Sequence, residues 1–148
     1  MTNVLTEQTA AVVEVELVFR PKPYEVDFTG FLSNTVAPRW MEELRVELMN
    51  THFPRFDTGT QEHLSVIAET QVKYIKPARY GDIIYGRAWL DSATYSRWVV
   101  AFTFHLQHDS SLMMQGQQVG VFINPHSLLP VRIPEVIKNL FTSARTLT

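Results

Sequence analysis

The residues of this 148-residue chain that could do chemistry begin with Asp27, an acidic residue set between apolar neighbours. Gly30 follows shortly after, and a helix is predicted to begin a few residues beyond it. A helix N-terminus presents unpaired backbone N–H groups and a positive dipole end, so it can polarise a carbonyl oxygen. A nearby carboxylate can activate water or attack the carbonyl carbon. The pattern suits acyl transfer or hydrolysis, and the alternative is a turn that uses Asp27 and Gly30 only for its own geometry.

The element that must position Asp27 is an amphipathic helix predicted over residues 35–50. The residues at its start, 33–35, are all favourable N-cap types, and Pro38 is tolerated because it falls in the first turn. Apolar residues recur every four positions and predict one buried stripe. The stripe consists of Val36, Trp40, Leu44 and Leu48, widened by Ala37 and Met41.

Alternating apolar and polar residues predict five strands, one before the helix and four after it. These strands are residues 14–20, 64–75, 83–90, 97–107 and 112–124. We expect consecutive strands to pair antiparallel, with the helix covering one face of the sheet. A short C-terminal helix is predicted over residues 134–142, and residues 1–12 are expected to fray. Together they predict one α+β domain over residues 1–148.

Two segments of the chain resemble hotdog-fold thioesterases, and the 4-hydroxybenzoyl-CoA thioesterase type in particular. The first segment is DFTGFLSN at residues 27–34 with VAPRWMEELR at residues 36–45. The second is KYIKPARYGD at residues 73–82, which is similar to the corner between the second and third strands of that family. The order of predicted elements also resembles a hotdog fold, in which a five-stranded antiparallel sheet wraps a long central helix.

The resemblance implies a thioesterase that hydrolyses acyl-CoA or acyl-carrier-protein thioesters to a carboxylic acid and a free thiol. Asp27 matches the catalytic carboxylate of the family. Asn34 matches the position whose backbone N–H polarises the thioester carbonyl. The other residues that we expect to shape the turn or contact the substrate are Gly30, Phe31, Ser33, Trp40, Glu43 and Arg97.

Some of these residues also have a simpler structural interpretation. Glu43 is a second candidate carboxylate, because another hotdog type uses a helical Glu, but exposed helix charges are common. Trp40 belongs to the apolar stripe and fits a core position. Arg97 is the basic residue beside residues 92–96, where some relatives hold CoA phosphates with a basic cluster. The acyl group could therefore be carried either by CoA or by an acyl-carrier protein.

Composition and motifs narrow the remaining classes. The chain has 13 Lys and Arg against 15 Asp and Glu, which argues against a nucleic-acid partner. It has no cysteine, which excludes a thiolate nucleophile and Cys-ligated zinc. Its histidines are scattered, so no metal site is expected, and no P-loop or G-x-G-x-x-G motif occurs, so no nucleotide cofactor is expected. No apolar run is long enough to span a membrane, and we expect a cytoplasmic protein.

Two alternatives to hydrolysis stay open, and the resemblance also bears on assembly. A hotdog dehydratase or hydratase acting on a 3-hydroxyacyl thioester is the first alternative, and a non-catalytic acyl-binding hotdog is the second. Hotdog domains pair through a sheet edge, with active sites at the subunit interface. The resemblance therefore implies a homodimer or a tetramer, and an exposed edge strand gives an independent reason to expect pairing.

Overall fold

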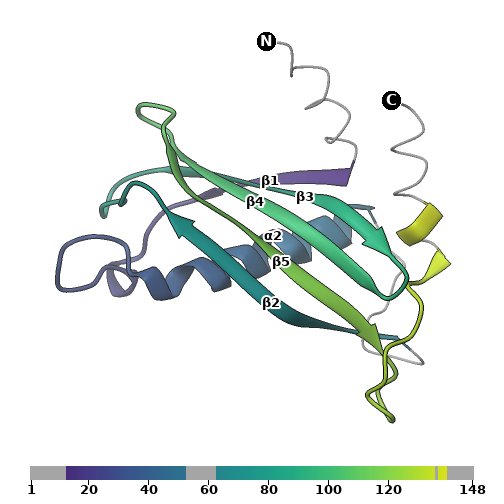
Figure 1. Cartoon of the computed structure of the whole chain (residues 1–148). Coiled ribbons are helices and arrows are strands. Elements are labelled where there is room, and N and C mark those ends of the chain that lie inside the picture. The colour runs from purple at the N-terminus through teal and green to yellow at the C-terminus, as the bar shows by residue number, and fades with distance from the viewer. Residues whose placement is uncertain (1–12, 53–62, 136, 140–148) are drawn as a thin grey trace.

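The computed structural model describes residues 13–52, 63–135 and 137–139 and shows a curved sheet around one long helix (Figure 1). The elements in chain order are β1 (Glu14–Phe19), η2 (Pro23–Glu25), η3 (Asn34–Val36), α2 (Ala37–His52), β2 (Leu64–Tyr74), β3 (Ile84–Thr94), β4 (Arg97–Leu106) and β5 (Leu112–Ile123). All neighbouring strands pair antiparallel. This arrangement confirms the predicted hotdog fold, a five-stranded antiparallel sheet wrapped around a central helix.

The apolar stripe of η3 and α2 is the face that lies against the sheet, as predicted. Its members are buried: Val36, Ala37, Trp40, Met41, Leu44 and Leu48. Trp40 stacks on Phe19 of β1 with ring centroids 4.7 Å apart, and it also meets Phe104 of β4. The single turn of η3 precedes the α-helix, which keeps Pro38 in the first turn of α2, where its missing N–H leaves no bond unmade.

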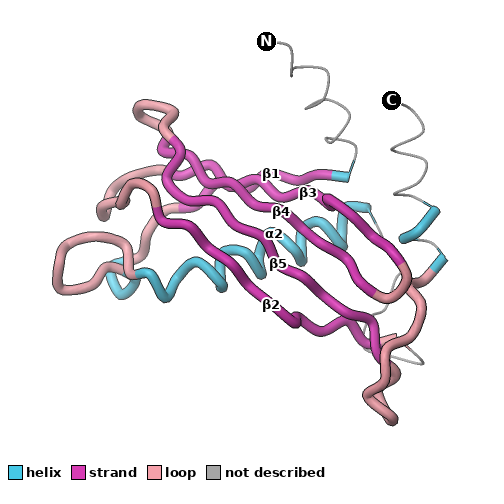
Figure 2. The backbone as a smooth tube through the Cα atoms, viewed as in Figure 1, coloured by secondary structure: helices cyan, strands magenta, loops and turns pink. Residues whose placement is uncertain are grey.

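The strand order is β1-β3-β4-β5-β2, which corrects one prediction (Figure 2). Strands β3, β4 and β5 pair with their neighbours in sequence, but β2 pairs with β5 and not with β3. Both sides of β3 are occupied, by β1 and β4. Residues 75–83 instead cross the end of the sheet. At roughly 3.3 Å per residue they can span the roughly 15 Å across three strand spacings.

Strand β3 runs to Thr94 rather than ending near residue 90 as predicted. A register shift between Leu90 and Ser92 lets the strand continue alongside β4. The connection to β4 is then a tight hairpin in which Tyr95 has a φ of 53°. The β3–β4 hairpin therefore lies at the end of the sheet far from Asp27.

The remaining predictions fall at the chain ends. Glu135 and residues 137–139 are helical, inside the span predicted for the C-terminal helix. The rest of that span and residues 1–12 lie outside the described residues. No helix in the described part of the chain has the length and apolar character needed to cross a membrane.

Candidate active site

Asp27 opens a tight turn between η2 and η3. Its carbonyl accepts a hydrogen bond from the Gly30 N–H at 3.0 Å, and its own N–H donates to the Phe31 carbonyl at 3.0 Å. Gly30 has a φ of 87°, in the left-handed region that glycine enters without steric cost. Flanking residues Val26 and Leu32 form a β-bridge that closes the loop. The sequence thus folds locally into a rigid turn that projects the Asp27 side chain.

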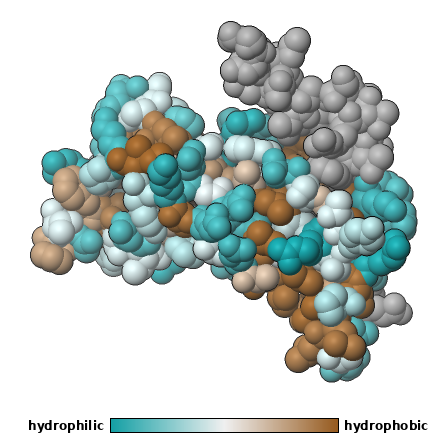
Figure 3. Space-filling view, in the orientation of Figure 1, coloured by the Kyte–Doolittle hydropathy of each residue, from teal (hydrophilic) through white to brown (hydrophobic). Residues whose placement is uncertain are grey.

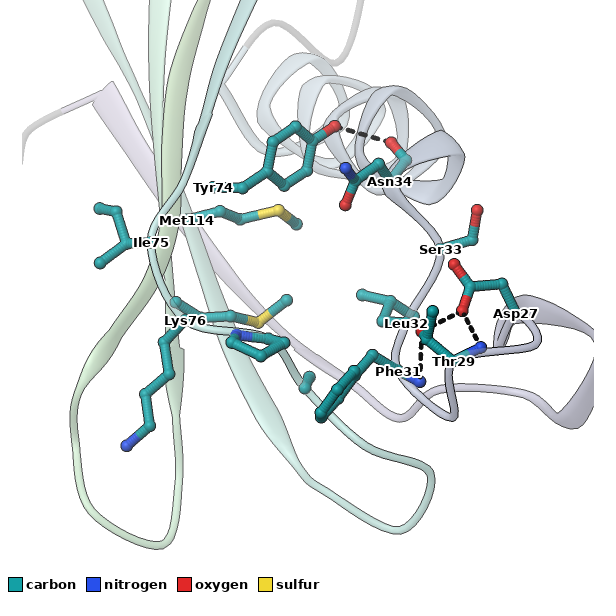
Figure 4. Close-up of a pocket in the computed structure, with 13 residues that line it drawn as sticks. Asp27, Thr29, Phe31, Leu32, Ser33, Asn34, Tyr74, Ile75, Lys76 and Met114 are labelled. Atoms are coloured by element: carbon teal, nitrogen blue, oxygen red, sulfur yellow. Dashed lines mark hydrogen bonds between the residues drawn. The ribbon is translucent and has the colours of Figure 1, made fainter.

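The Asp27 carboxylate is held through one oxygen only. Its Oδ1 accepts from the Thr29 N–H at 2.9 Å and from the Thr29 hydroxyl. These two bonds, the hydroxyl bond first, lower the pKa of Asp27 below its ordinary value. Its Oδ2 has no hydrogen-bond partner among the described residues and lies on the side of Ser33 (Figure 4). Asp27 is therefore an ionised carboxylate with one oxygen free to act.

The start of η3 supplies a free backbone donor beside this carboxylate. Ser33 caps the turn, because its Oγ accepts from the Thr35 N–H at 3.2 Å and its carbonyl accepts from the Val36 N–H at 3.1 Å. The Asn34 N–H has no acceptor within the described part of the chain. The helix that continues from this turn adds its positive dipole end. The Asn34 N–H can therefore hold a carbonyl oxygen that gains negative charge.

A cavity of about 430 Å³ separates this turn from the ends of β2 and β5. The turn contributes Asp27, Thr29, Phe31, Leu32, Ser33 and Asn34. The facing wall consists of Tyr74, Ile75, Lys76, Pro77, Ala78, Met113 and Met114. Figure 4 shows the two walls with the cavity between them. The lining combines apolar side chains with carboxylate, hydroxyl and amide groups near the turn.

Four contacts dock the turn on the facing wall and on Arg79 beside it. The Leu32 N–H donates to the Ala78 carbonyl at 2.8 Å, and Phe31 forms a β-bridge with Arg79. The Arg79 guanidinium lies 4.5 Å from the centroid of the Phe31 ring. The Tyr74 hydroxyl donates to the Asn34 carbonyl at 2.7 Å. The cavity is therefore braced on both sides of its mouth.

Lys76 lines the cavity, but its ammonium group points away from the interior (Figure 4). Its Nζ pairs with Asp109 of the β4–β5 turn at 2.6 Å. Hydrogen bonds from Lys76 and then from Ser111 hold the pKa of Asp109 well below its usual range. The Lys76 ammonium group therefore pairs with a carboxylate outside the cavity. The carboxylate that lines the cavity is that of Asp27.

The structure brings together only part of the predicted set. Of the predicted residues, Asp27, Phe31, Ser33 and Asn34 line the cavity, and Gly30 shapes the turn behind them. The other three lie elsewhere: Trp40 in the core against Phe19, Glu43 exposed on α2, and Arg97 at the opposite end of the sheet.

Sequence reasoning missed the partner of Asp27 and most of the facing wall. Thr29 lies inside the motif, and its spacing from Asp27 is the signal of a side-chain-closed turn. The stretch at residues 73–82 was singled out by resemblance, without a role for Tyr74. Met113 and Met114 gave no signal, because apolar strand residues have the same pattern whether they line a cavity or the core.

The described residues contain no group of three or more His, Cys, Asp or Glu side chains that could hold a metal ion. The groups at the cavity without a hydrogen-bond partner among the described residues include Oδ2 of Asp27 and the Asn34 N–H.

Comparisons with solved structures return the same fold at low sequence identity. A predicted thioesterase from Bacillus stearothermophilus is 21% identical, with a TM-score of 0.76 over 88% of this chain and 96% of that one. A DHNA-CoA thioesterase from Staphylococcus aureus is 16% identical, with a TM-score of 0.80 over 90% and 92%. A 12:0-ACP thioesterase from Umbellularia californica is also 16% identical, with a TM-score of 0.80 over 89% of this chain and 50% of that one.

A search of curated proteins finds no match. The family model of the thioesterase-like superfamily matches residues 21–141, which include the Asp27 turn, α2 and strands β2 to β5. The chain therefore belongs to the thioesterase-like superfamily.

Proposed function

We propose that this protein hydrolyses an acyl thioester, carried by CoA or by an acyl-carrier protein, to a carboxylic acid and a free thiol. One observation carries the proposal: the free oxygen of Asp27 and the unoccupied Asn34 N–H border the same apolar cavity. Membership of the thioesterase-like superfamily supports it.

In this mechanism the Asn34 N–H receives the thioester carbonyl oxygen and stabilises the negative charge that develops on it. Asp27 either attacks the carbonyl carbon or removes a proton from the attacking water. The C–S bond then breaks, and the sulfur leaves as a thiolate that takes up a proton. Phe31, Leu32 and Met114 supply apolar surface for the acyl group.

The dehydratase or hydratase alternative is less well supported by the cavity. The described residues that line it include no histidine, and among them Asp27 is the carboxyl group for proton transfer. Hydrolysis needs only this carboxylate, a water molecule and the backbone donor.

Asp27→Asn tests the proposal, because the amide keeps the shape of the side chain but cannot act as a base or a nucleophile. We expect free-thiol release from a panel of acyl-CoAs to fall by about 10²- to 10⁴-fold, the range of a positioned general base. Asp91→Asn is the matched control, an exposed Asp on β3 away from the cavity, and it should leave the rate unchanged. Full activity of Asp27→Asn would contradict the mechanism, and enoyl-CoA hydration by the wild type would favour the alternative.

We also propose that the working form is a homodimer paired through β2, a pairing that further assembly could extend to a tetramer. Strand β2 is an edge strand whose residues are mostly exposed on both faces. The opposite edge, β1, is shorter and is followed by Pro21 and Pro23, which cannot donate to a ladder. Asp27 is fully exposed in the single chain, so a second copy against this edge would help to enclose the site.

Ile67→Lys tests this interface, since a lysine on an edge strand opposes pairing. Ile67 on β2 is 36% exposed, and the matched control is Val18→Lys on β1, where Val18 is 53% exposed. Light scattering after size exclusion should give a dimer for the wild type and Val18→Lys, and a monomer for Ile67→Lys. A monomeric wild type, or a dimer disrupted by Val18→Lys instead, would contradict pairing through β2.

A further inference from the structure

We propose that Tyr74 is a specificity-determining residue that limits the length of the acyl group this site accepts. The inference rests on the proposed function, since it concerns the same cavity and an acyl ligand. It assigns a role to a residue of the KYIKPARYGD stretch for which the resemblance implies none.

Tyr74 reaches across the cavity from the edge strand to the helix start. It is the last residue of β2 and pairs with the buried Met114 of β5, so it lies on the inner face of the sheet. Its hydroxyl donates to the Asn34 carbonyl at 2.7 Å. In Figure 4 the ring and this bond form a bridge over one end of the cavity, directly beside the predicted carbonyl site.

Beyond this bridge the inner face of β2 continues with smaller side chains. Val72 is half-buried, Thr70 is exposed, and the partner of Val72 on β5 is Gly116. A side chain at Gly116 would meet the Met41 methyl group at 3.0 Å, so the neighbour on the helix side is the tip of a flexible residue. Val72 packs against the core with part of its surface still exposed. Of the side chains at 70, 72 and 74 on this face of β2, the Tyr74 ring is the largest and the one that lines the cavity.

The geometry gives the ring and the hydroxyl separate effects. An acyl group whose carbonyl oxygen is bound at the Asn34 N–H meets the Tyr74 ring if it extends along the inner face of β2. The hydroxyl fixes the peptide group that follows Asn34 and so positions the neighbouring N–H. Burial raises the pKa of Tyr74, which keeps the phenol protonated and able to donate.

The test compares Tyr74→Leu, which shortens the side chain, with Tyr74→Phe, which keeps the ring and removes the hydroxyl. Tyr80→Leu is the matched control, because Tyr80 is an exposed tyrosine of the same crossing segment and does not line the cavity. Binding is measured by thermal stabilisation and titration with S-(2-oxoalkyl)-CoA ketones, which are not hydrolysed, from acetyl to palmitoyl length. Hydrolysis of the matching acyl-CoAs is measured in parallel.

We expect Tyr74→Leu to move the optimum of binding and kcat/KM to longer chains. The preference for long over short chains should change by at least about tenfold, as one methylene in an apolar pocket is worth about 10- to 200-fold. Tyr74→Phe should keep the wild-type optimum and lower kcat about two- to tenfold at every length, the effect of one neutral hydrogen bond. Tyr80→Leu should match the wild type.

An unchanged optimum in folded Tyr74→Leu overturns the inference, and so does the absence of stabilisation by any ketone. The failure of the proposed function is a different result, in which the wild type binds the ketones but releases no thiol. In that case the binding profiles still decide the role of Tyr74.

Discussion

The two ends of the sheet are built from similar parts but differ in how their polar groups are used. At the Asp27 end, a carboxylate oxygen and a backbone N–H are left without partners among the described residues. At the far end, the indole N–H of Trp98 donates to the Ser65 hydroxyl at 2.9 Å, and its ring packs on Gly120. At the Asp27 end the unpartnered groups border a cavity, which makes this the end where we expect a substrate to bind.

The amount of exposed apolar surface does not distinguish the two ends of the sheet. Figure 3 shows hydrophobic surface toward both ends of the visible face. Large apolar side chains are exposed near the Asp27 turn, at Tyr24, Phe28 and Tyr80, and also beyond β5, at Leu128 and Leu129. A search for hydrophobic patches alone would not have distinguished the candidate site from the opposite end.

The largest expected contrast between the ends is the loss of stability when one glycine at each end is replaced by alanine. A Cβ at Gly120 would lie 1.9 Å from the Trp98 ring, whereas one at Gly30 would meet nothing within 4 Å. We expect Gly120→Ala to lower the free energy of unfolding by about 3 kcal/mol, the upper range for overpacking. Gly30→Ala should cost about 1–2 kcal/mol through its left-handed backbone. Urea unfolding measures both, and equal losses would break the contrast.

The next contrast is in pH dependence and concerns the bonds that Thr29 makes to Asp27. The two bonds lower the pKa of Asp27. In the proposed mechanism the ionised form of Asp27 is the active one, so activity should be lost as the pH falls through that pKa. Thr29→Val removes the hydroxyl bond and should move the acid limb of the pH–kcat profile to higher pH while leaving the plateau unchanged. Thr29→Ser should restore the wild-type limb. A limb that does not move would show that Thr29 serves only the turn.

The smallest contrast is the single hydrogen bond between Trp98 and Ser65 at the far end. Ser65→Ala leaves the N–H of a buried indole unpaired, so we expect a loss of about 1 kcal/mol in the free energy of unfolding. Tyr85→Phe is the control, because it removes an exposed bond to Gln107 that should contribute almost nothing. Turnover should be unchanged in both. A drop in turnover for Ser65→Ala would link the far end to catalysis.

The features of the fold and site that could be predicted depend on residues that are close together in the sequence. Asp27, Gly30 and Asn34 fall within one short run, where turn chemistry and helix capping are local. The stripe that buries Trp40 follows from helical periodicity in the same way. Resemblance added the hotdog topology, which these local patterns do not specify.

The other wall of the cavity could not be predicted, because it depends on which strands become neighbours. Tyr74 faces Asn34 only because β2 pairs with β5 and lies at the sheet edge. The expectation that consecutive strands pair would have placed β2 beside β3. Met114 likewise has the pattern of a core residue, and only the position of the Asp27 turn makes it part of a cavity wall.

The strand order also has a consequence for the order of events as the chain is made. Strand β2 leaves the ribosome well before its sheet partner β5, which begins only at Leu112. Until then its backbone groups have no strand to join, although β3 and β4 can already form a hairpin. The Tyr74 bridge and the facing wall at Met114 thus come into register only after β5 has been made, so the site forms later than the β3–β4 hairpin.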